Sequence, residues 1–469
     1  MTKYTFDIPN NTAIDAFGKL HHMPYSLLLD SVDEKHPDAK YSFIAFMPIE
    51  TIECKNGRVQ ITNAKGQNSF ENMNPFDAVQ ECLRHYRLSV INDPDLPPFQ
   101  GGVAGFFGYD LGRNLETLPN IAEENADMPD MAVGIYDQVL AYNHKTNKLT
   151  LIIQTDNEEQ ANTKYQHVLK LLDAPAQSNK FDAFDPDWRS NFTKSAYMKQ
   201  IQRIINYIRK GDIFQANMTQ RFDAELPNDF DSYAHYLNLR EVSPAPFASY
   251  FNLGHIKISS SSPERFLTVN GGVVETKPIK GTAARLDDKA LNQLNMNGLE
   301  NSEKERAENV MIVDLLRNDL SKVCRPDAVD VVKLCALESF ANVHHLVSTL
   351  RAKLRQGYSA SELLKACFPG GSITGAPKIR AMEIIEELEP TRRGPYCGSM
   401  GYIGFDDTMD TNILIRTLVY QGNAVSFQVG GGITVDSNPE QEYQETLDKA
   451  QGILNSFTHG NVKKKKKAA

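Results

Sequence analysis

The stretch ETKPIKGTAAR, residues 275–285, places a lysine at the end of an expected strand and directly before a glycine. The run GGVVETKPI starts with paired glycines and continues with β-branched residues, a pattern typical of a strand. Gly281 would let the backbone turn sharply or approach a ligand closely. Lys280 is interpreted either as an ordinary solvated residue or as a buried amine with a chemical task, and position alone favours the first.

The sequence around this stretch predicts an α+β fold with large antiparallel β-sheets. Strand patterns occur at residues 40–54, 249–262 and 424–437, and helical patterns at 74–88, 303–323 and 439–457. Another helix is expected to begin at Ser195 as its N-cap and to end at Gly211. Strands and helices alternate without regular βα units, which argues against a parallel sheet.

Composition indicates a soluble globular protein. The 469 residues are 41% hydrophobic and 23% charged, and the net charge of −9 implies no general affinity for nucleic acid. Six cysteines lie far apart without a CxxC pair, so neither a zinc site nor a disulfide framework is predicted. No segment approaches the roughly 18 apolar residues of a membrane span. We therefore expect a cytoplasmic protein without a membrane contact.

Length predicts two or three domains. Residues 1–175 are expected to form an N-terminal region, and residues 173–190 resemble a linker because they are rich in Pro, Asp, Ser and Asn. Residues 190–457 follow as a second region. Residues 458–469 contain a run of five lysines and are expected to be a disordered tail.

Two expected helices each carry a pair of glutamates three residues apart, and such pairs lie on one helix face. The pairs are Glu305 with Glu308 and Glu442 with Glu445. Together they could form an oxygen-rich site for Mg²⁺. The alternative is two solvated helix faces, with Glu445 and Lys449 as an ordinary ion pair.

Further candidates lie in glycine-rich and polar stretches. Successive amides in an expected turn at 430–432 could hold a carboxylate. The stretch PGGSITGAPK, residues 369–378, imitates a phosphate loop, but Ala and Pro separate its last glycine from the lysine, so nucleotide binding is rejected. Glu264 could act as a general acid or base near Lys280. His344 and His345 are neighbours that point to different sides, and Arg416 in a β-branched run requires a carboxylate partner.

The motifs PIKGT, RAENVMIVDLLRNDL, VHHLVSTL, GGSITGAPK, MDTNILIRT, VGGGI and YQETLDKA resemble, in this order, those of the chorismate-utilising enzymes. The resemblance covers about residues 190–457, and GGVAGFFGYDLGR at 101–113 resembles the N-terminal part of the same family. It implies a two-sheet sandwich with helices packed outside, as in anthranilate synthase component I.

Lys280 distinguishes branches of this family. PIKGT is similar to the aminodeoxychorismate synthases, whereas anthranilate synthases have PIAGT at this place. The resemblance implies that chorismate and ammonia give 4-amino-4-deoxychorismate, for para-aminobenzoate and folate synthesis, with Lys280 as covalent nucleophile and Glu264 as general acid and base. It also implies Mg²⁺ bound by Glu308 and Glu445, supported by Glu305 and Glu442. The implied substrate-binding residues are Thr282, Arg317, His345, Ser372, Tyr396, Arg416, Gly430 and Gly432.

The resemblance also implies partners. The sequence lacks a glutaminase-type cysteine nucleophile, so a separate glutamine amidotransferase subunit is expected to supply ammonia. A tryptophan pocket is implied, formed by Ser31, Lys40, Tyr41, Pro246, Phe247 and Ala248, whereas the alternative is a core strand whose serine caps a turn. Two other functions stay open: an anthranilate or salicylate synthase, and a non-catalytic protein that binds chorismate or tryptophan.

Overall fold

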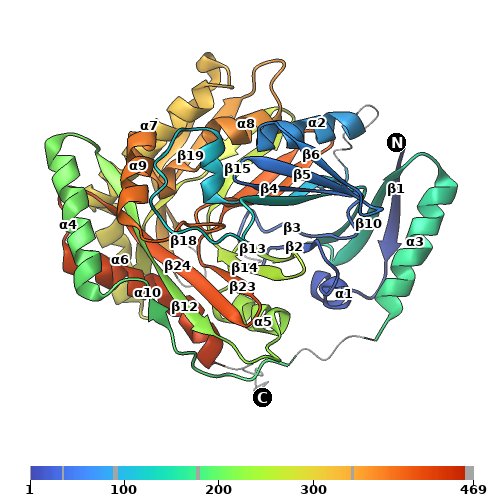
Figure 1. Cartoon of the computed structure of the whole chain (residues 1–469), viewed down its shortest axis with the longest axis horizontal. Helices are drawn as coiled ribbons and strands as arrows, with labels where there is room; N and C mark the ends of the chain where they lie inside the picture. The colour runs from blue at the N-terminus through green and yellow to red at the C-terminus, as the bar shows by residue number, and fades with distance from the viewer. Residues whose placement is uncertain are drawn as a thin grey trace.

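The computed structural model describes residues 2–33, 36–87, 93, 95–175, 180–339 and 343–459. Within these ranges the strands form two large antiparallel sheets, which confirms the predicted α+β class (Figure 1). The first sheet runs, in spatial order, through β1 (Thr2–Ile8), β10 (Lys148–Thr155), β9 (Gln138–Asn143), β3 (Tyr41–Ala45), β2 (Ser26–Asp30), β13 (Phe247–Asn252), β14 (Ile256–Ser262), β23 (Thr417–Gln421), β24 (Ala424–Ile433), β12 (Gln215–Glu225) and β11 (Arg189–Ser190), with β20 (Gly375–Ala376) on β12.

The second sheet contains the strand of Lys280 at one end. Its spatial order is β17 (Ile279–Ala284), β19 (Val343–Lys353), β16 (Val273–Thr276), β15 (Arg265–Asn270), β22 (Met409–Ile413), β21 (Ser399–Gly404), β7 (Gly102–Phe107), β8 (Met131–Tyr136), β4 (Glu50–Lys55), β5 (Arg58–Asn63) and β6 (Asn68–Glu71), with β18 (Asp330–Ser339) on β19.

Both sheets combine strands from the two halves of the sequence. In the first sheet β2 pairs with β13, with Leu29 opposite Ser249. In the second sheet β7 pairs with β21, with Gly105 opposite Gly401. The predicted domain division near residues 175–190 stays a prediction, and the two sequence regions share one pair of sheets.

Aromatic side chains fill the space between the sheets. Phe43 of the first sheet contacts Tyr402 of the second, with ring centroids 5.6 Å apart, and Tyr402 stacks on Phe99 at 4.4 Å. All three are buried. Offset and edge-on aromatic pairs of this kind add to the free energy of burial, so they hold the two sheets in a fixed relation.

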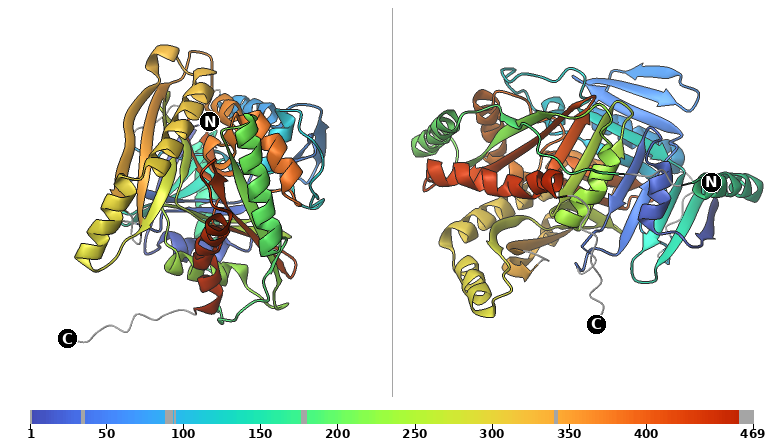
Figure 2. Two further views of the ribbon diagram at one scale, coloured as in Figure 1. Left: turned by 90° about the vertical axis from the view of Figure 1, so that its left-hand side faces the viewer. Right: turned by 90° about the horizontal axis from the view of Figure 1, so that it is seen from below.

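Helices cover the outer faces. Helices α4 and α10 contact each other and cover β12 and β24, whereas α6 and α7 cover the β17–β19 end of the second sheet (Figures 1 and 2). The helices are α1 (Ala13–Leu20), α2 (Pro75–Arg87), α3 (Glu158–Asp173), α4 (Lys194–Lys210), α5 (Ser232–Val242), α6 (Lys289–Glu300), α7 (Glu303–Ser321), α8 (Ala360–Cys367), α9 (Lys378–Leu388) and α10 (Pro439–Thr458).

Three predictions of element bounds were wrong. The expected strand at 249–262 is a hairpin of β13 and β14, with residues 253–255 between the two strands. The expected strand at 40–54 is divided into β3 and β4, which belong to different sheets, and Met47 between them has a positive φ of 53°. The N-cap of α4 is Thr193, not Ser195, because the Thr193 hydroxyl accepts the amide hydrogen of Ala196 at 3.2 Å. The predicted C-terminal stop at Gly211 is confirmed, with a left-handed φ of 83°. The lysine tail from residue 460 onward lies outside the described residues.

Candidate active site

Lys280 lies where one end of the second sheet meets β24 of the first. Its Nζ donates to the carbonyl oxygen of Ser372 at 3.3 Å. The same nitrogen is 3.4 Å from the point where a Cβ on Gly432 would lie. Gly281 interrupts the pairing of β17 with β19 and has a φ of 72°, and a Cβ there would be 2.7 Å from Leu299. A glycine is therefore required beside the lysine.

Glu264 is buried next to this lysine. Its carboxyl group accepts hydrogen bonds from the Ser372 hydroxyl and the Ile279 amide. Burial raises the pKa of Glu264 to about 7, although these hydrogen bonds and the nearby Lys280 charge favour the ionised form. A carboxyl group with a pKa near neutrality can both donate and accept a proton under physiological conditions.

The two predicted glutamate pairs face the same region from two helices. Glu442 and Glu445 of α10 lie 3.3 and 3.4 Å from the position of a Cβ on Gly431, and Glu305 of α7 lies 3.0 Å from that of Gly281. Burial raises the pKa values of Glu305 and Glu308, and each carboxylate feels the charge of at least one member of the other helix. The four carboxylates therefore form one acidic surface beside Lys280.

Two lysines partly neutralise this surface. Lys304 Nζ lies 3.2 Å from Glu442, and Lys449 Nζ lies 2.7 Å from Glu445. Partial burial raises the pKa of Glu445, but Lys449 outweighs it and holds the pKa below its ordinary value. Among the described residues no three acidic, histidine or cysteine side chains converge closely enough to enclose a metal ion. Mg²⁺ commonly takes only one or two carboxylates plus substrate and water oxygens, so this donor set fits it.

The three glycines fall within the strand predicted at 424–437, which forms as β24, whereas the turn also predicted at 430–432 was wrong. Gly430 and Gly432 pair with Thr219 and Asn217 in a regular ladder. A Cβ at Gly430 would lie 2.3 Å from a backbone oxygen of β12. The pairing of β23 with β24 ends at Phe427, so beyond it β24 is paired with β12 alone. The glycines therefore leave room and an unpaired strand side next to Lys280.

Tyr396 is buried and Arg416 is half-buried. Loss of solvation lowers the pKa of Arg416, and none of the described acidic residues forms an ion pair with its guanidinium. Its φ of 51° is unusual for a side chain of this size. Tyr396 is buried and belongs to the same apolar cluster as Ile373 and Ile413. A half-buried arginine that no described carboxylate pairs with is suited to an anionic ligand.

The two adjacent histidines have different partners, as predicted. His345 Nδ1 lies 3.0 Å from the Thr282 hydroxyl and 3.1 Å from the Gly281 carbonyl oxygen, so it adjoins the Lys280 strand. Burial lowers its pKa to about 4, which keeps the ring neutral. His344 instead contacts Ser339 and Asn292 at 2.8 and 2.9 Å. His344 is therefore a structural residue.

Arg317 was also predicted to bind substrate, but none of its described contacts joins it to this cluster. It is exposed, and its guanidinium pairs with Asp314 on the same helix at 3.0 Å. The apolar residues of α7 lie on the opposite face, against the sheet, because helical periodicity separates them from Arg317.

Sequence reasoning missed Gln215, which begins β12. Its buried side chain reaches the space above Gly432, where its Nε2 would be 2.0 Å from an added Cβ. Its Oε1 has no hydrogen-bond partner among the described residues. No local pattern marks this residue, because a glutamine that follows the apolar pair Ile213 and Phe214 is unremarkable until the strand register is known. The i,i+4 spacing in the sequence predicted the ion pair of Lys449 with Glu445. It did not predict that Lys449 Nζ also donates to the Gly430 carbonyl oxygen at 2.9 Å.

A separate cavity of about 730 Å³ is lined by residues 29–98 from the first half of the sequence and residues 246–412 from the second. All six residues predicted for a tryptophan pocket line it: Ser31, Lys40, Tyr41, Pro246, Phe247 and Ala248. The Ser31 hydroxyl donates to the Tyr41 carbonyl oxygen at 2.8 Å, so its lone pairs stay available to a ligand ammonium group. The volume is within the range of small-molecule sites, about 300–1,000 Å³.

None of the helices in the described part of the chain is both long and apolar enough to cross a membrane.

Comparison with known proteins agrees with this geometry. Residues 25–455 match the family model of chorismate binding enzymes. Aminodeoxychorismate synthase component 1 of Escherichia coli is 42% identical over 93% of this chain and 94% of its own length. Anthranilate synthase component 1 of Thermus thermophilus is 36% identical, with 96% of each chain covered. The crystal structure of anthranilate synthase component I from Streptococcus pneumoniae has a TM-score of 0.79 at 33% identity and covers 89% of this chain and 93% of its own. The chain therefore belongs to the chorismate-binding enzyme family.

Proposed function

We propose that this chain is the aminating component of an aminodeoxychorismate synthase, which converts chorismate and ammonia to 4-amino-4-deoxychorismate. The observation that carries the proposal is the adjacency of Lys280 and Glu264, which share Ser372 as a hydrogen-bond partner. Similarity to aminodeoxychorismate synthase component 1 from Escherichia coli supports it.

The two residues divide the chemistry. The neutral amine of Lys280 forms a bond to C2 of chorismate, the ring double bond shifts, and the C4–O bond breaks. Protonated Glu264 gives its proton to the leaving hydroxyl, which departs as water. Ammonia then forms a bond to C4 while the C2–N bond breaks and restores neutral Lys280. Glu264 takes the excess proton from the new amine and is ready for another turnover. Covalent attachment at C2 thus directs ammonia to C4.

Other side chains would hold the substrate during these steps. Arg416 and the unpaired side of β24 at the glycines would bind the enolpyruvyl carboxylate, with Tyr396 packed nearby. Gln215 offers an amide oxygen to a donor on the substrate or on ammonia. His345, kept neutral by burial, would orient Thr282 beside the nucleophile.

Mg²⁺ would be held by Glu308 and Glu445, with Glu305 and Glu442 behind them. When bound, the ion would supply positive charge for the ring carboxylate of chorismate. Lys304 and Lys449, which pair with two of these carboxylates, would have to share them with the ion.

Loss of either principal carboxylate should weaken metal binding. We expect Glu308→Gln and Glu445→Gln each to raise the Mg²⁺ concentration for half-maximal activity at least about tenfold, the loss typical even of an outer-sphere partner. Thermal unfolding should change little, because neither carboxylate supports the core. Titration of activity with Mg²⁺ measures the half-saturating concentration, calorimetry measures the affinity for the metal, and a thermal melt measures the unfolding midpoint. Unchanged half-saturation and unchanged maximal rate in both variants would remove these residues from the site.

Ammonia would come from a separate glutamine amidotransferase subunit. The name "component 1" carried by the Escherichia coli relative implies a synthase with more than one component. Cys397 also does not suit a glutaminase nucleophile, because burial raises its pKa to about 12 and its thiolate is disfavoured.

Product analysis tests the proposed function. Purified chain with chorismate, Mg²⁺ and ammonium should give 4-amino-4-deoxychorismate, identified by mass spectrometry and chromatography, and glutamine should not replace ammonium. Anthranilate or isochorismate as the main product would assign another activity of the family. Absence of any turnover with intact chorismate binding would favour a non-catalytic binding protein, and hydrolysis of glutamine by the pure chain would contradict the need for a partner.

The cavity that Ser31 and Phe247 line is proposed to bind tryptophan without a strong regulatory effect. The Ser31 hydroxyl and backbone groups would hold the amino-acid ends, and Phe247 and Tyr41 would supply apolar walls. We expect micromolar or tighter binding by calorimetry, weakened by Ser31→Ala, with little inhibition, because a ligand changes activity only through different affinities for active and inactive states. No heat at millimolar tryptophan would refute the site, and strong inhibition would refute the non-regulatory part.

A further inference from the structure

Arg393 is a fully enclosed charge outside the residues already assigned to the reaction. Only 2% of it is exposed. Its Nε and one terminal nitrogen donate to the two oxygens of Glu389 at 2.9 and 2.7 Å, and its guanidinium lies 4.6 Å from the Tyr109 ring centre. A buried ion pair of this kind adds little net stability compared with apolar residues of equal volume.

The remaining donors reach two backbone segments that carry site residues. One nitrogen donates to the Ile373 carbonyl oxygen at 2.8 Å, and another donates to that of Asn217 at 3.1 Å. Ile373 follows Ser372, the partner of both Lys280 and Glu264. Asn217 is the strand neighbour of Gly432.

The ion-pair partner extends the same connection. Glu389 Oε1 accepts the amide hydrogen of Thr219 at 2.9 Å, and Thr219 is the strand neighbour of Gly430. The ion pair of Arg393 and Glu389 thus connects the segment that follows Ser372 to β12. The β12 residues that it holds are the strand neighbours of Gly430 and Gly432.

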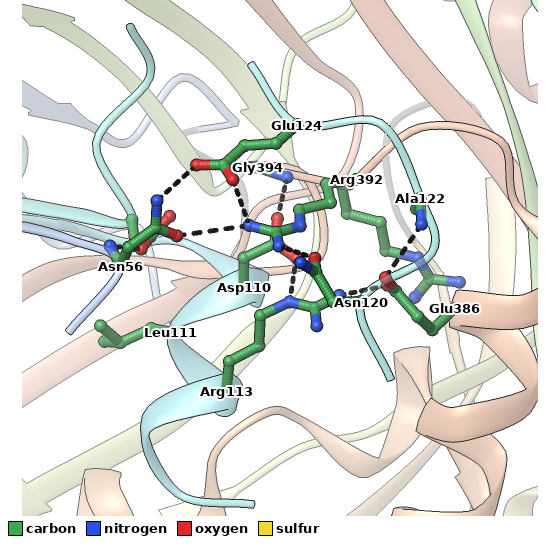
Figure 3. A network of polar contacts seen from close by, with 12 residues as sticks. Asn56, Asp110, Leu111, Arg113, Asn120, Ala122, Glu124, Glu386, Arg392 and Gly394 are labelled. Atoms are coloured by element: carbon green, nitrogen blue, oxygen red, sulfur yellow. Dashed lines mark hydrogen bonds and ion pairs between the residues drawn. The ribbon is translucent and has the colours of Figure 1, made fainter. Parts of the chain in front are cut away.

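The backbone of Arg393 is fixed as well. Its carbonyl oxygen accepts from Gln428 of β24 at 2.9 Å and from the Tyr396 amide at 3.2 Å. Asp110 accepts the amide hydrogen of the next residue, Gly394, at 2.7 Å, and Figure 3 shows this contact within a network that joins residues 110–124 to residues 386–394. The segment leading to Tyr396 is therefore held from both sequence halves.

We propose that Arg393 is a positioning residue, which sets the mutual placement of Ser372, the β24 glycines and Tyr396 around the substrate. The inference rests on the proposed function in that it takes chorismate as the molecule held there. Arginine suits the task because its planar fork reaches a carboxylate and two carbonyl oxygens at once, whereas a lysine ammonium is a single point charge. Displacements of about 1 Å in such a frame can lower a rate about 100-fold.

Two variants test this role. Arg393→Lys keeps the charge opposite Glu389 but cannot serve all four acceptors, and Glu389→Gln keeps an acceptor for Thr219 but removes the charge that orients the guanidinium. We expect kcat/KM for chorismate with ammonium to fall roughly 10- to 100-fold in the first and less in the second. Calorimetry should show weaker chorismate binding in both. The unfolding midpoint of each variant is measured first, and the kinetics are then measured at a temperature well below the lowest midpoint.

The control is Arg240→Lys. Arg240 also forms a shielded pair, with Asp30 at 3.0 Å, but it adjoins none of the substrate segments. It should lower the unfolding midpoint and leave kcat/KM unchanged. If both test variants keep kcat/KM and chorismate affinity within twofold of wild type, Arg393 has only a structural role and the proposal is wrong. If Arg393→Lys does not fold, Glu389→Gln decides. A wild-type chain that binds chorismate but aminates nothing would refute the proposed function. The chorismate affinities of the two variants relative to wild type would still test the role of Arg393.

Discussion

Replacing Lys280 with alanine is expected to lower the rate of 4-amino-4-deoxychorismate formation by roughly a thousandfold, which corresponds to about 4 kcal/mol of transition-state stabilisation. The amine forms the bond to C2 that expels the C4 hydroxyl, and no other described lysine donates to Ser372 beside Glu264. Chorismate affinity should change much less, because the carboxylate-binding groups remain. Steady-state kinetics with ammonium measure the first effect, and calorimetry measures the second.

Lys277→Ala is the matched control. Lys277 lies three residues earlier and pairs with Asp38 at 2.8 Å, away from the candidate active site. Its removal should leave the rate unchanged. Wild-type chain incubated with chorismate but without ammonia should also accumulate a covalent adduct on Lys280, detectable by mass spectrometry of the peptide. Normal product formation by Lys280→Ala would show that the amine is not the nucleophile.

Glu264→Gln should have an effect of similar size, a loss of about 10²- to 10⁴-fold in kcat, the usual contribution of a general acid or base. In the wild type, the protonated fraction of Glu264 declines as pH rises through about 7, so the step that expels the hydroxyl should slow above that pH. The residual activity of the glutamine variant should lack this part of the pH profile. An identical profile in both proteins would assign the proton transfer to another group.

The same substitution should stabilise the fold. The pKa of Glu264 is raised from 4.5 to about 7, so between these values the unfolded chain loses a proton that the folded chain keeps. The free energy of unfolding therefore falls as pH rises through this window, by about 3 kcal/mol for a shift of this size. Urea unfolding should show little difference between Glu264→Gln and wild type near pH 4 and the largest gain for the variant above pH 7. A constant difference at all pH values would contradict the raised pKa.

The sequence predicted which side chains lie together around Lys280 better than it predicted the residues that hold them there, whereas their chemical roles stay predictions. Lys280, Glu264 and the glutamate pairs could be found because each motif is local and its residue type is tied to a reaction. The helices α7 and α10 could be found because their apolar periodicity and caps are local too. The glycines of β24 were misassigned, since a run of glycines favours a turn and only the neighbouring strand shows that side chains are excluded.

Other residues could not be found from one sequence. Gln215, Arg393 and Glu389 act through partners that are far away in the chain, such as Asn217 for Arg393. Arg317 shows the opposite error: the motif drew attention to it, but helical geometry places it on the exposed face. Long-range register decides these cases, and local patterns do not contain it.

The sharing of both sheets also has a consequence for synthesis on the ribosome. The strands before residue 156 form two blocks, β1-β10-β9-β3-β2 and β7-β8-β4-β5-β6, and their inner edges, β2 and β7, are completed by β13 and β21. Both edge strands are mostly apolar and buried in the finished protein. In a nascent chain the edge of β2 therefore stays unpaired until β13 has emerged, at residue 252, and the edge of β7 until β21 has emerged, at residue 404. Unpaired strand edges of this kind are prone to aggregation. We expect this interval, more than the marginal stability of any helix, to set the dependence of folding yield on chaperones and growth temperature.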